Sequence, residues 1–234
     1  MNTVQRVLRK LKQKRDARHL DPAVNPASTE FEVNNWLLSE FIVKKLVPVV
    51  GMHPYPIAEL QLMAAAVCRF KPEQVFEWGT NIGKSARIFF ETGKRFNIPM
   101  EIHSVDLPDD IDHQEHPRSD RGRLVRGRAG VTLHQADGLA TAIALHARNP
   151  GKRTLVFIDG DHSHASVLRE LQGITQAMPQ AAILLHDTFY QSDDAGYNTG
   201  PFRAIEETLA MMPGRYRRIA VTTGLPGMTL LYPA

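Results

Sequence analysis

The chain lacks several features that would assign it to a specialised class of protein. Its 234 residues include a single cysteine, Cys68, so an internal disulfide is excluded. No stretch reaches the roughly 18 apolar residues of a membrane span, and the first residues lack the apolar core of a secretory signal. We therefore expect a reducing, cytoplasmic location. Because Cys68 lies in an apolar run, we expect a buried thiol that acts as a small hydrophobe.

Excess positive charge is absent beyond the first twenty residues. Residues 1–20 hold seven basic residues and one acidic residue, whereas the remainder holds 21 basic and 24 acidic residues. The net charge of +3 therefore belongs to the tail, and we expect no nucleic-acid partner for the fold. Apolar residues at helical spacing in 1–20 indicate a basic amphipathic helix, with a disordered tail as the alternative. Such a helix could make a weak contact with an anionic membrane surface.

Short apolar runs alternate with amphipathic stretches along most of the chain. This order predicts an α/β fold, a Rossmann-like, doubly wound, mostly parallel seven-stranded sheet with a C-terminal antiparallel hairpin and N-terminal helices. The expected strands are 74–79, 101–107, 131–136, 155–159, 182–185, 218–222 and 228–232. The expected helices between them are 84–96, 138–147, 164–178 and 201–212.

The chain divides into three predicted parts. Residues 1–20 form the tail, 21–72 an N-terminal helical segment, and 73–234 the ligand-binding domain. Within the second part, one helix is expected from Trp36 until it stops near Pro48, and another over 57–70. This segment is expected to serve as a lid or as a contact in a homodimer.

A glycine loop follows the first strand of the predicted sheet. The run 75–85 reads V-F-E-W-G-T-N-I-G-K-S, so an acidic residue ends the strand and two glycines precede a helix. Such a loop places backbone N–H groups and a helix N-terminus beside a ligand. Gly83-Lys84-Ser85 fits the end of a P-loop, but Trp78 occupies the position of its first glycine. The pattern G-x-G-x-x-G of a dinucleotide site is also absent.

Acidic residues end the later strands, at the edge where open α/β sheets bind ligands. Asp106 stands where a carboxylate can accept hydrogen bonds from ribose hydroxyls. Asp137 could accept from an adenine amine, or cap the helix that follows it. Asp159 and Asp187 end strands that should be neighbours, and paired carboxylates suit a hard cation such as Mg²⁺. His162, three residues beyond Asp159, could act as a general base near neutral pH.

These motifs resemble the class I S-adenosylmethionine (SAM) methyltransferases of the small O-methyltransferase type. The first motif is similar to E-x-G-x-x-x-G-x-S, and 157–164 with 184–188 resemble I-D-G-D-H-S-x and L-L-H-D-T of the macrocin-type sugar O-methyltransferases and cephalosporin-hydroxylase-like proteins. The resemblance implies a general base at His162, beside Asp159, and a divalent cation at Asp159, His186 and Asp187. His186 departs from the acid usual in metal-dependent members, and imidazole favours transition metals over Mg²⁺. The implied SAM contacts are Glu77, Gly79, Thr80, Asn81, Gly83, Ser85, Asp106, Asp137, Asp159 and Asp161.

Three functions follow as alternatives. The favoured one is an enzyme that transfers a methyl group from SAM to a hydroxyl of a small molecule, a sugar or natural product, with a divalent cation as a potential second cofactor. The second is a P-loop-like NTPase or small-molecule kinase that uses 83–85. The third is a methyltransferase-like protein that binds or hydroxylates without methyl transfer.

The polar insert 107–130, with His113 and His116, follows the second strand on the ligand side of the sheet.

Overall fold

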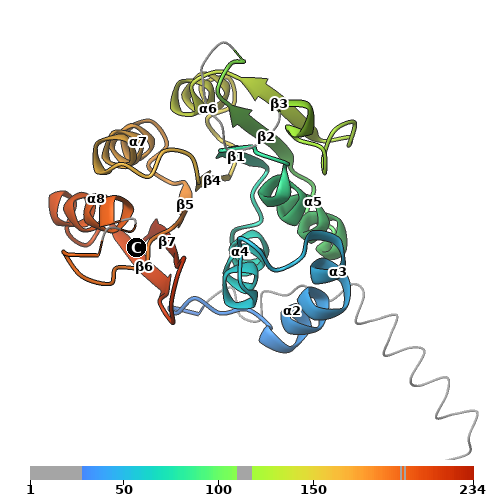
Figure 1. Ribbon diagram of the computed structural model, residues 1–234, viewed down its shortest axis with the longest axis horizontal. Helices are drawn as coiled ribbons and strands as arrows, with labels where there is room; N and C mark the ends of the chain where they lie inside the picture. The colour runs from blue at the N-terminus through green and yellow to red at the C-terminus, as the bar shows by residue number, and fades with distance from the viewer. Residues whose placement is uncertain (1–27, 110–117, 196, 198) are drawn as a thin grey trace, which may run out of the picture.

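Seven strands form one mixed sheet in the computed structural model, which describes residues 28–109, 118–195, 197 and 199–234 (Figure 1). The spatial order is β3-β2-β1-β4-β5-β7-β6. Strands β1 to β5 are parallel, whereas β7 pairs antiparallel with both β5 and β6. The strands are β1 Gln74–Trp78, β2 Glu101–Asp106, β3 Val131–Gln135, β4 Thr154–Ile158, β5 Ala182–His186, β6 Tyr216–Val221 and β7 Met228–Pro233. The predicted fold class is confirmed, including the C-terminal hairpin.

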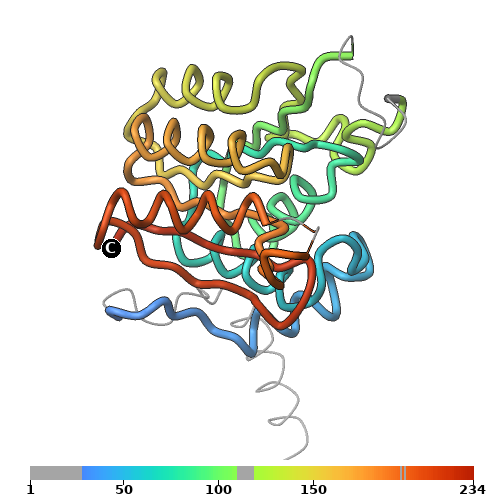
Figure 2. Tube along the Cα trace, turned by 60° about the vertical axis from the view of Figure 1, so that its left-hand side comes forward, coloured from blue at the N-terminus to red at the C-terminus, as the bar shows by residue number. Residues whose placement is uncertain are grey.

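Helices cover both faces of this sheet. Figures 1 and 2 show α6, α7 and α8 along one face, while α4 and α5 lie on the other with α2 and α3 outside them. The N-terminal elements are α2 Asn35–Phe41, the π-helical turn η1 Ile42–Leu46, α3 Val47–Val50 and α4 Ile57–Phe70. The later ones are α5 Lys84–Phe96, the 3-10 turn η2 Arg118–Asp120, α6 Gly138–His146, α7 His164–Ala177 and α8 Thr199–Met211.

Alternate residues of the central strands point into two separate apolar cores. Phe76, Val156 and Ile183 are buried in the core beneath α6, α7 and α8. Their neighbours along the chain point the other way, and Leu155 and Leu184 enter the core that α4 and α5 cover. Burial on both faces explains why these strands read as continuous apolar runs. The polar residues that follow them are therefore gathered at one edge, where the carboxyl ends of β1 to β5 meet.

The first helical stretch does not stop near Pro48, contrary to prediction. It continues to Val50, and Gly51, with a φ of 72°, ends it. The π-helical turn η1 directly precedes α3, and Pro48 lies in the first turn of α3. Leu46 and Val47 keep helical backbone angles, and the N–H of Val47 bonds five residues back to Ile42, so the helix continues through the proline at this wider turn.

Some expectations fall outside the part of the chain that the structure describes. They are the helix or disordered tail at 1–20 and the portion of the insert that contains His113 and His116. The division at residue 72 stays a prediction, although α2 and α4 share an apolar core with the sheet. Among the described helices, none has both the length and the apolar content to span a membrane.

Candidate active site

The glycine loop lies directly against the end of β4. Gly79 has a φ of 89°, and a Cβ atom there would stand 2.0 Å from the backbone oxygen of Asp159. Gly83 has a φ of 83°, and its Cβ would stand 2.8 Å from Cγ2 of Val125. Both glycines are therefore required by backbone conformation and by close contact. Asn81 also has a positive φ of 44°, and its side chain accepts a hydrogen bond from the N–H of Ile82 at 2.6 Å.

A buried carboxylate stands beneath this loop. Glu77 is fully buried, and one of its oxygens accepts a hydrogen bond from the hydroxyl of Ser85. Its other oxygen, Oε1, has no hydrogen-bond partner among the described residues. Burial raises the pKa of Glu77 to about 8, although the hydroxyls of Ser104 and Ser85 oppose the shift. Thr80 is bonded to Ser104 at 2.7 Å. A buried acceptor thus lies beneath the loop, and a cationic donor such as the ammonium group of SAM would satisfy it.

The residues that suggested a P-loop are engaged elsewhere. The hydroxyl of Ser85 points into the protein at Glu77, and Ser85 is buried. The ammonium group of Lys84 donates to the backbone oxygen of His53. A P-loop needs this serine on a metal ion and this lysine on phosphates. The geometry therefore does not support the NTPase or kinase alternative.

Asp106 ends β2 as predicted, but its carboxylate is shared with an arginine. One oxygen accepts from the N–H of Leu107 at 3.0 Å, and the other from Nε of Arg121 at 3.1 Å. Arg121 is itself buried and also binds Asp109. A ribose would have to share Asp106 with this guanidinium group. The predicted ribose contact stays a prediction, and no sequence pattern pointed to Arg121.

Asp137 and Asp161 both serve as helix-starting residues. Asp137 caps α6 by accepting from the N–H of Ala140 at 2.7 Å, and it also accepts from Arg169 at 3.2 Å. Asp161 accepts from the N–H of Ser163 at 2.9 Å, directly before α7, and this bond lowers its pKa. Their local roles are structural, and their predicted contacts with the cofactor stay predictions.

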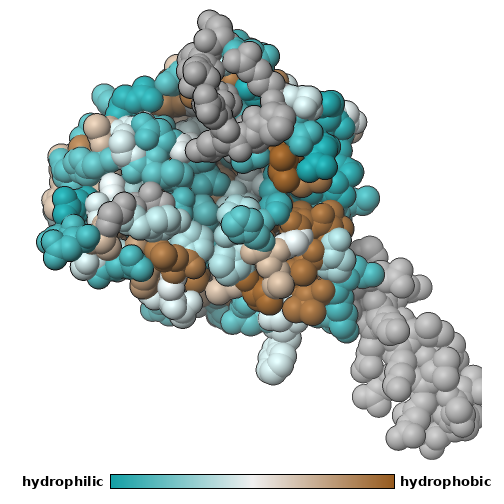
Figure 3. All heavy atoms as spheres, viewed as in Figure 1, coloured by the Kyte–Doolittle hydropathy of each residue, from teal (hydrophilic) through white to brown (hydrophobic). Residues whose placement is uncertain are grey.

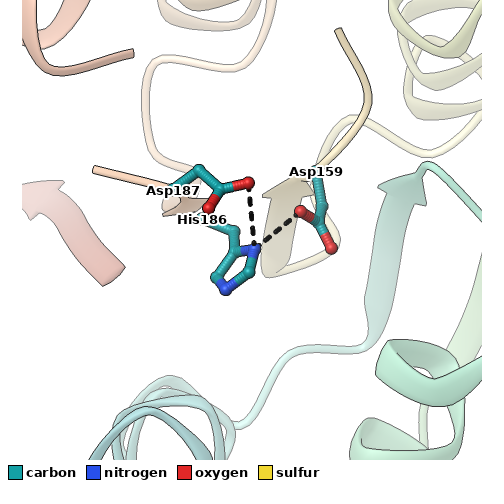
Figure 4. A group of neighbouring side chains, drawn as sticks. All are labelled: Asp159, His186 and Asp187. Carbon is teal, nitrogen blue, oxygen red and sulfur yellow. Dashed lines mark hydrogen bonds and ion pairs between the residues drawn. The ribbon is translucent and has the colours of Figure 1, made fainter. Parts of the chain in front are cut away.

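Three residues predicted from β4 and β5 do come together. Figure 4 shows Asp159, His186 and Asp187 converging at the ends of these neighbouring strands. Nδ1 of His186 lies 2.9 Å from Oδ1 of Asp159 and 3.7 Å from Oδ2 of Asp187. One ligand atom from each residue lies within 4.8 Å of the other two. The pairing of β4 with β5 thus produces the predicted cluster.

Two residues that the sequence analysis missed complete this cluster from the N-terminal segment. Glu59, on α4, contacts Nε2 of His186 at 3.1 Å through one oxygen, and its other oxygen accepts from the N–H of Gly227 at 2.8 Å. The hydroxyl of Tyr55 donates to Oδ2 of Asp159 at 2.5 Å. The signal for Glu59 was its position one helical turn before Met63, on the buried side of α4. Tyr55 had no comparable signal.

His162 lies at the outer side of the same cluster. Its Nε2 atom stands 3.2 Å from Oδ2 of Asp187, and its side chain is 30% exposed. The hydroxyl of Tyr197 donates to the other oxygen of Asp187 at 2.9 Å. A cavity of about 460 Å³ opens beside the imidazole, lined by His162, Ser163, His164, Thr199, Gly200 and Arg203. The predicted base therefore faces a space where a small molecule could lie, and Asp187 orients it.

Hydrogen bonding within the cluster leaves a poor ligand set for a divalent cation. Burial alone would lower the pKa of His186, but Asp159, Glu59 and Asp187 outweigh it and raise the pKa to about 10. Burial and Asp159 also raise the pKa of Tyr55 well above its ordinary value, so the phenol remains a donor. A metal at Nδ1 would have to displace a proton and several hydrogen bonds. The residues present do not fit a resident Mg²⁺ ion.

Comparisons with known proteins agree with the class that the fold and the motifs define. Residues 76–188 match the family model described as a methyltransferase domain. Curated protein sequences provide no match to the chain.

Several solved structures share the fold at low identity. A Podospora anserina methyltransferase bound to S-adenosylhomocysteine superposes with a TM-score of 0.56 at 15% identity, covering 82% of this chain and 87% of that one. A Bacillus cereus O-methyltransferase in complex with the same product gives 0.55 at 15% identity, over 84% and 90%. The TDP-rhamnose 3'-O-methyltransferase of calicheamicin biosynthesis gives 0.53 at 16% identity, over 83% and 86%. The predicted resemblance is confirmed at this level: residues 76–188 match the methyltransferase model, and solved O-methyltransferases share the fold.

Proposed function

We propose that this protein transfers the methyl group of SAM to a hydroxyl group of a small molecule. One observation carries the proposal: within the region that matches the methyltransferase model, an Asp187–His162 pair lies at the edge of a cavity, and Gly79 of the glycine loop lies against Asp159. The neighbouring structures that carry SAM or S-adenosylhomocysteine support the choice of cofactor. SAM supplies an electrophilic methyl group on a sulfonium ion.

The glycine loop is the proposed binding surface for SAM. Gly79 and Gly83 keep the backbone close to the end of β4, so that N–H groups and the start of α5 face the ligand. The unpartnered oxygen of Glu77 supplies a hydrogen-bond acceptor from below, and a bound cation favours the ionised form of this carboxyl group. Thr80, Asn81, Asp106, Asp137, Asp159 and Asp161 remain the proposed further contacts.

His162 is the proposed general base. Its Nε2 atom faces a carboxylate oxygen of Asp187, which accepts hydrogen bonds only, so the proton of neutral His162 lies on that nitrogen. The other ring nitrogen is then the acceptor for the proton of the substrate hydroxyl. As that oxygen forms its bond to the methyl carbon, the carbon–sulfur bond breaks and S-adenosylhomocysteine is the leaving group. His162 holds the released proton, and Asp187 stabilises the resulting imidazolium.

The acceptor is proposed as a sugar or natural-product hydroxyl that enters the cavity beside His162. The structural neighbour that acts on TDP-rhamnose supports a sugar as one member of this class. Arg203 and His164 line the cavity and pair with Asp193 and Glu207, so the cavity is polar. The position of the cavity beside His162 supports this choice of acceptor. A product screen identifies the acceptor itself.

A binding test and a product screen examine the proposal. Calorimetry should show saturable binding of SAM and of S-adenosylhomocysteine, with no binding of ATP. Cell extract incubated with methyl-labelled SAM should then yield a product heavier by one methyl group. The His162→Gln variant should bind SAM normally and form little product, whereas His146→Gln, on the far end of α6, should match the wild type. Binding of ATP without SAM would contradict the function.

The contact roles predicted for the N-terminal segment remain proposals. Tyr55 and Glu59 reach the cluster, which supports a part in closing the site. Figure 3 shows apolar side chains gathered over the region of the N-terminal helices. The exposed ones in this segment are Trp36, Val43, Val49, Met52 and Ile57. A homodimer through this surface would be lost in Trp36→Lys, as light scattering after gel filtration would show. The membrane contact of 1–20 and the cytoplasmic location stay predictions.

A further inference from the structure

His186 lies between two carboxylates, one on each side of its ring, namely the buried Glu59 and the partly buried Asp159. Nδ1 is 2.9 Å from Asp159 and Nε2 is 3.1 Å from Glu59. The imidazole is 4% exposed and Glu59 is 1% exposed, so water is largely excluded from both contacts. An ionised carboxylate only accepts hydrogen bonds. With both carboxylates as acceptors, both ring nitrogens act as donors, and the side chain is then a buried cation.

The remaining oxygens of the cluster are also engaged with hydrogen-bond donors. Asp159 accepts a hydrogen bond from the hydroxyl of Tyr55 on Oδ2, the oxygen that does not contact His186. Asp187 accepts a hydrogen bond from the hydroxyl of Tyr197 on one oxygen, and its other oxygen faces Nε2 of His162. Glu59 uses its second oxygen for the N–H of Gly227. Each of the three carboxylates therefore has both oxygens in contact with protein donors.

We propose that the side chain of His186 occupies the place of the divalent cation in this site, so that the protein works without a metal. This inference rests on the proposed methyl transfer and concerns which cation balances the carboxylates of the same site. His186 is a positioning residue: it is too buried to touch the substrate, and it acts through Asp159 and Asp187. By balancing their charge, it holds Asp187 in the position that faces His162.

The same residues allow one competing arrangement. If His186 lost the proton on Nδ1, Glu59 could hold its Nε2–H while Nδ1, Asp159 and Asp187 bound a transition metal, since a carboxylate behind a histidine is common at metal sites. That arrangement requires Tyr55 and His162 to release or share the oxygens they contact. The two arrangements differ in whether added metal binds and in whether both nitrogens of His186 stay protonated.

Metal titration of the full chain separates them without any methyl transfer. Protein stripped with EDTA and then freed of it is titrated with MgCl₂, MnCl₂ and ZnCl₂ at pH 7.5 in a calorimeter. The wild type should show no saturable 1:1 binding in the micromolar range. The His186→Asp variant replaces the internal cation with a third carboxylate, and it should gain saturable binding of Mn²⁺ and a raised melting temperature in its presence. His164→Asp, which also introduces a carboxylate but at a half-exposed site on α7, should gain neither.

A second measurement keeps the proposal testable if His186→Asp does not fold. Long-range ¹H–¹⁵N spectra of the wild type at pH 8 should show two protonated ring nitrogens for His186, unchanged by stoichiometric Zn²⁺. A neutral His186 ring that binds Zn²⁺, tight 1:1 metal binding by the wild type, or a folded His186→Asp variant without metal binding would each overturn the proposal. Because none of these readouts uses SAM, they stand or fall separately from the proposed reaction.

Discussion

The raised pKa of His186 predicts a specific loss of stability in alkaline solution. A histidine with a folded pKa of about 10 binds a proton that the unfolded chain releases near its ordinary value of 6.5. The stabilisation is therefore complete below pH 6.5 and is lost as the pH rises through 10. Each pH unit between these values is worth about 1.36 kcal/mol. Allowing for partial titration near 10, the free energy of unfolding should fall by about 2 kcal/mol between pH 8 and pH 10.

This window is chosen because another buried group titrates below it. Glu77, with a pKa of about 8 against an ordinary 4.5, loses its contribution between those two values. The loss of the Glu77 contribution is largely complete at pH 8, so His186 dominates the change in the free energy of unfolding above that point. The upper part of the profile therefore reports on one ion cluster, namely His186 with Asp159 and Glu59.

Urea unfolding at pH 8, 9 and 10, in EDTA, measures the effect. The wild type should show the loss, whereas His186→Gln should be less stable at pH 8 and should lack the steep part of the profile. His164→Gln, which removes a half-exposed histidine that pairs with Glu207, should follow the wild type. If His186→Gln does not fold, the double variant with Glu59→Gln removes a carboxylate as well and should give the same flat profile. Parallel profiles for the wild type and these His186 variants would refute the reasoning.

Three further outcomes follow from the site. Gly79→Ala should destabilise the protein by at least about 2 kcal/mol and abolish SAM binding, because the added Cβ atom would meet the backbone of Asp159. Urea unfolding and calorimetry measure the two effects, and Gly151→Ala, which has open space around it, is the matched control. The affinity for SAM should rise by up to tenfold per pH unit from pH 6 to 8, and binding should release protons, because a bound cation favours ionised Glu77. Glu77→Gln should remove this pH dependence, and a flat wild-type profile would contradict the role of Glu77. His162→Gln should lower turnover by about 10²–10⁴-fold with SAM affinity retained, and near-normal turnover would remove the residue from the mechanism.

Local sequence patterns were enough to predict the order of strands and helices. The central strands are short and apolar because both faces are buried, and this property is visible without any partner strand. The loop at 79–83 was also predictable, since two glycines with positive φ leave a clear mark in the sequence. The exception was Pro48, because a π-helical turn before a proline depends on how the helix packs and leaves no simple pattern.

The positions of Asp159, His186 and Asp187 followed from the same reasoning, because residues at the ends of adjacent parallel strands must meet. The identity of their partners did not follow. Glu59 lies 127 residues from His186 along the chain, and Tyr55 lies 104 residues from Asp159. No periodicity links such distant positions, so only the packing of α4 against the sheet brings them together.

The sequence by itself determined which chemical groups stand at the edge of the sheet, since strand ends and glycine turns are local properties. Only the tertiary structure decided what each group contacts. It directed Ser85 to Glu77 instead of toward a phosphate, and it placed Arg121 on Asp106. It also enclosed His186 between two carboxylates, which turned an expected metal ligand into a buried cation. The physical reason is that the charge of a titratable group depends on its neighbours in space, and those of His186 come from α4 and from the ends of β4 and β5.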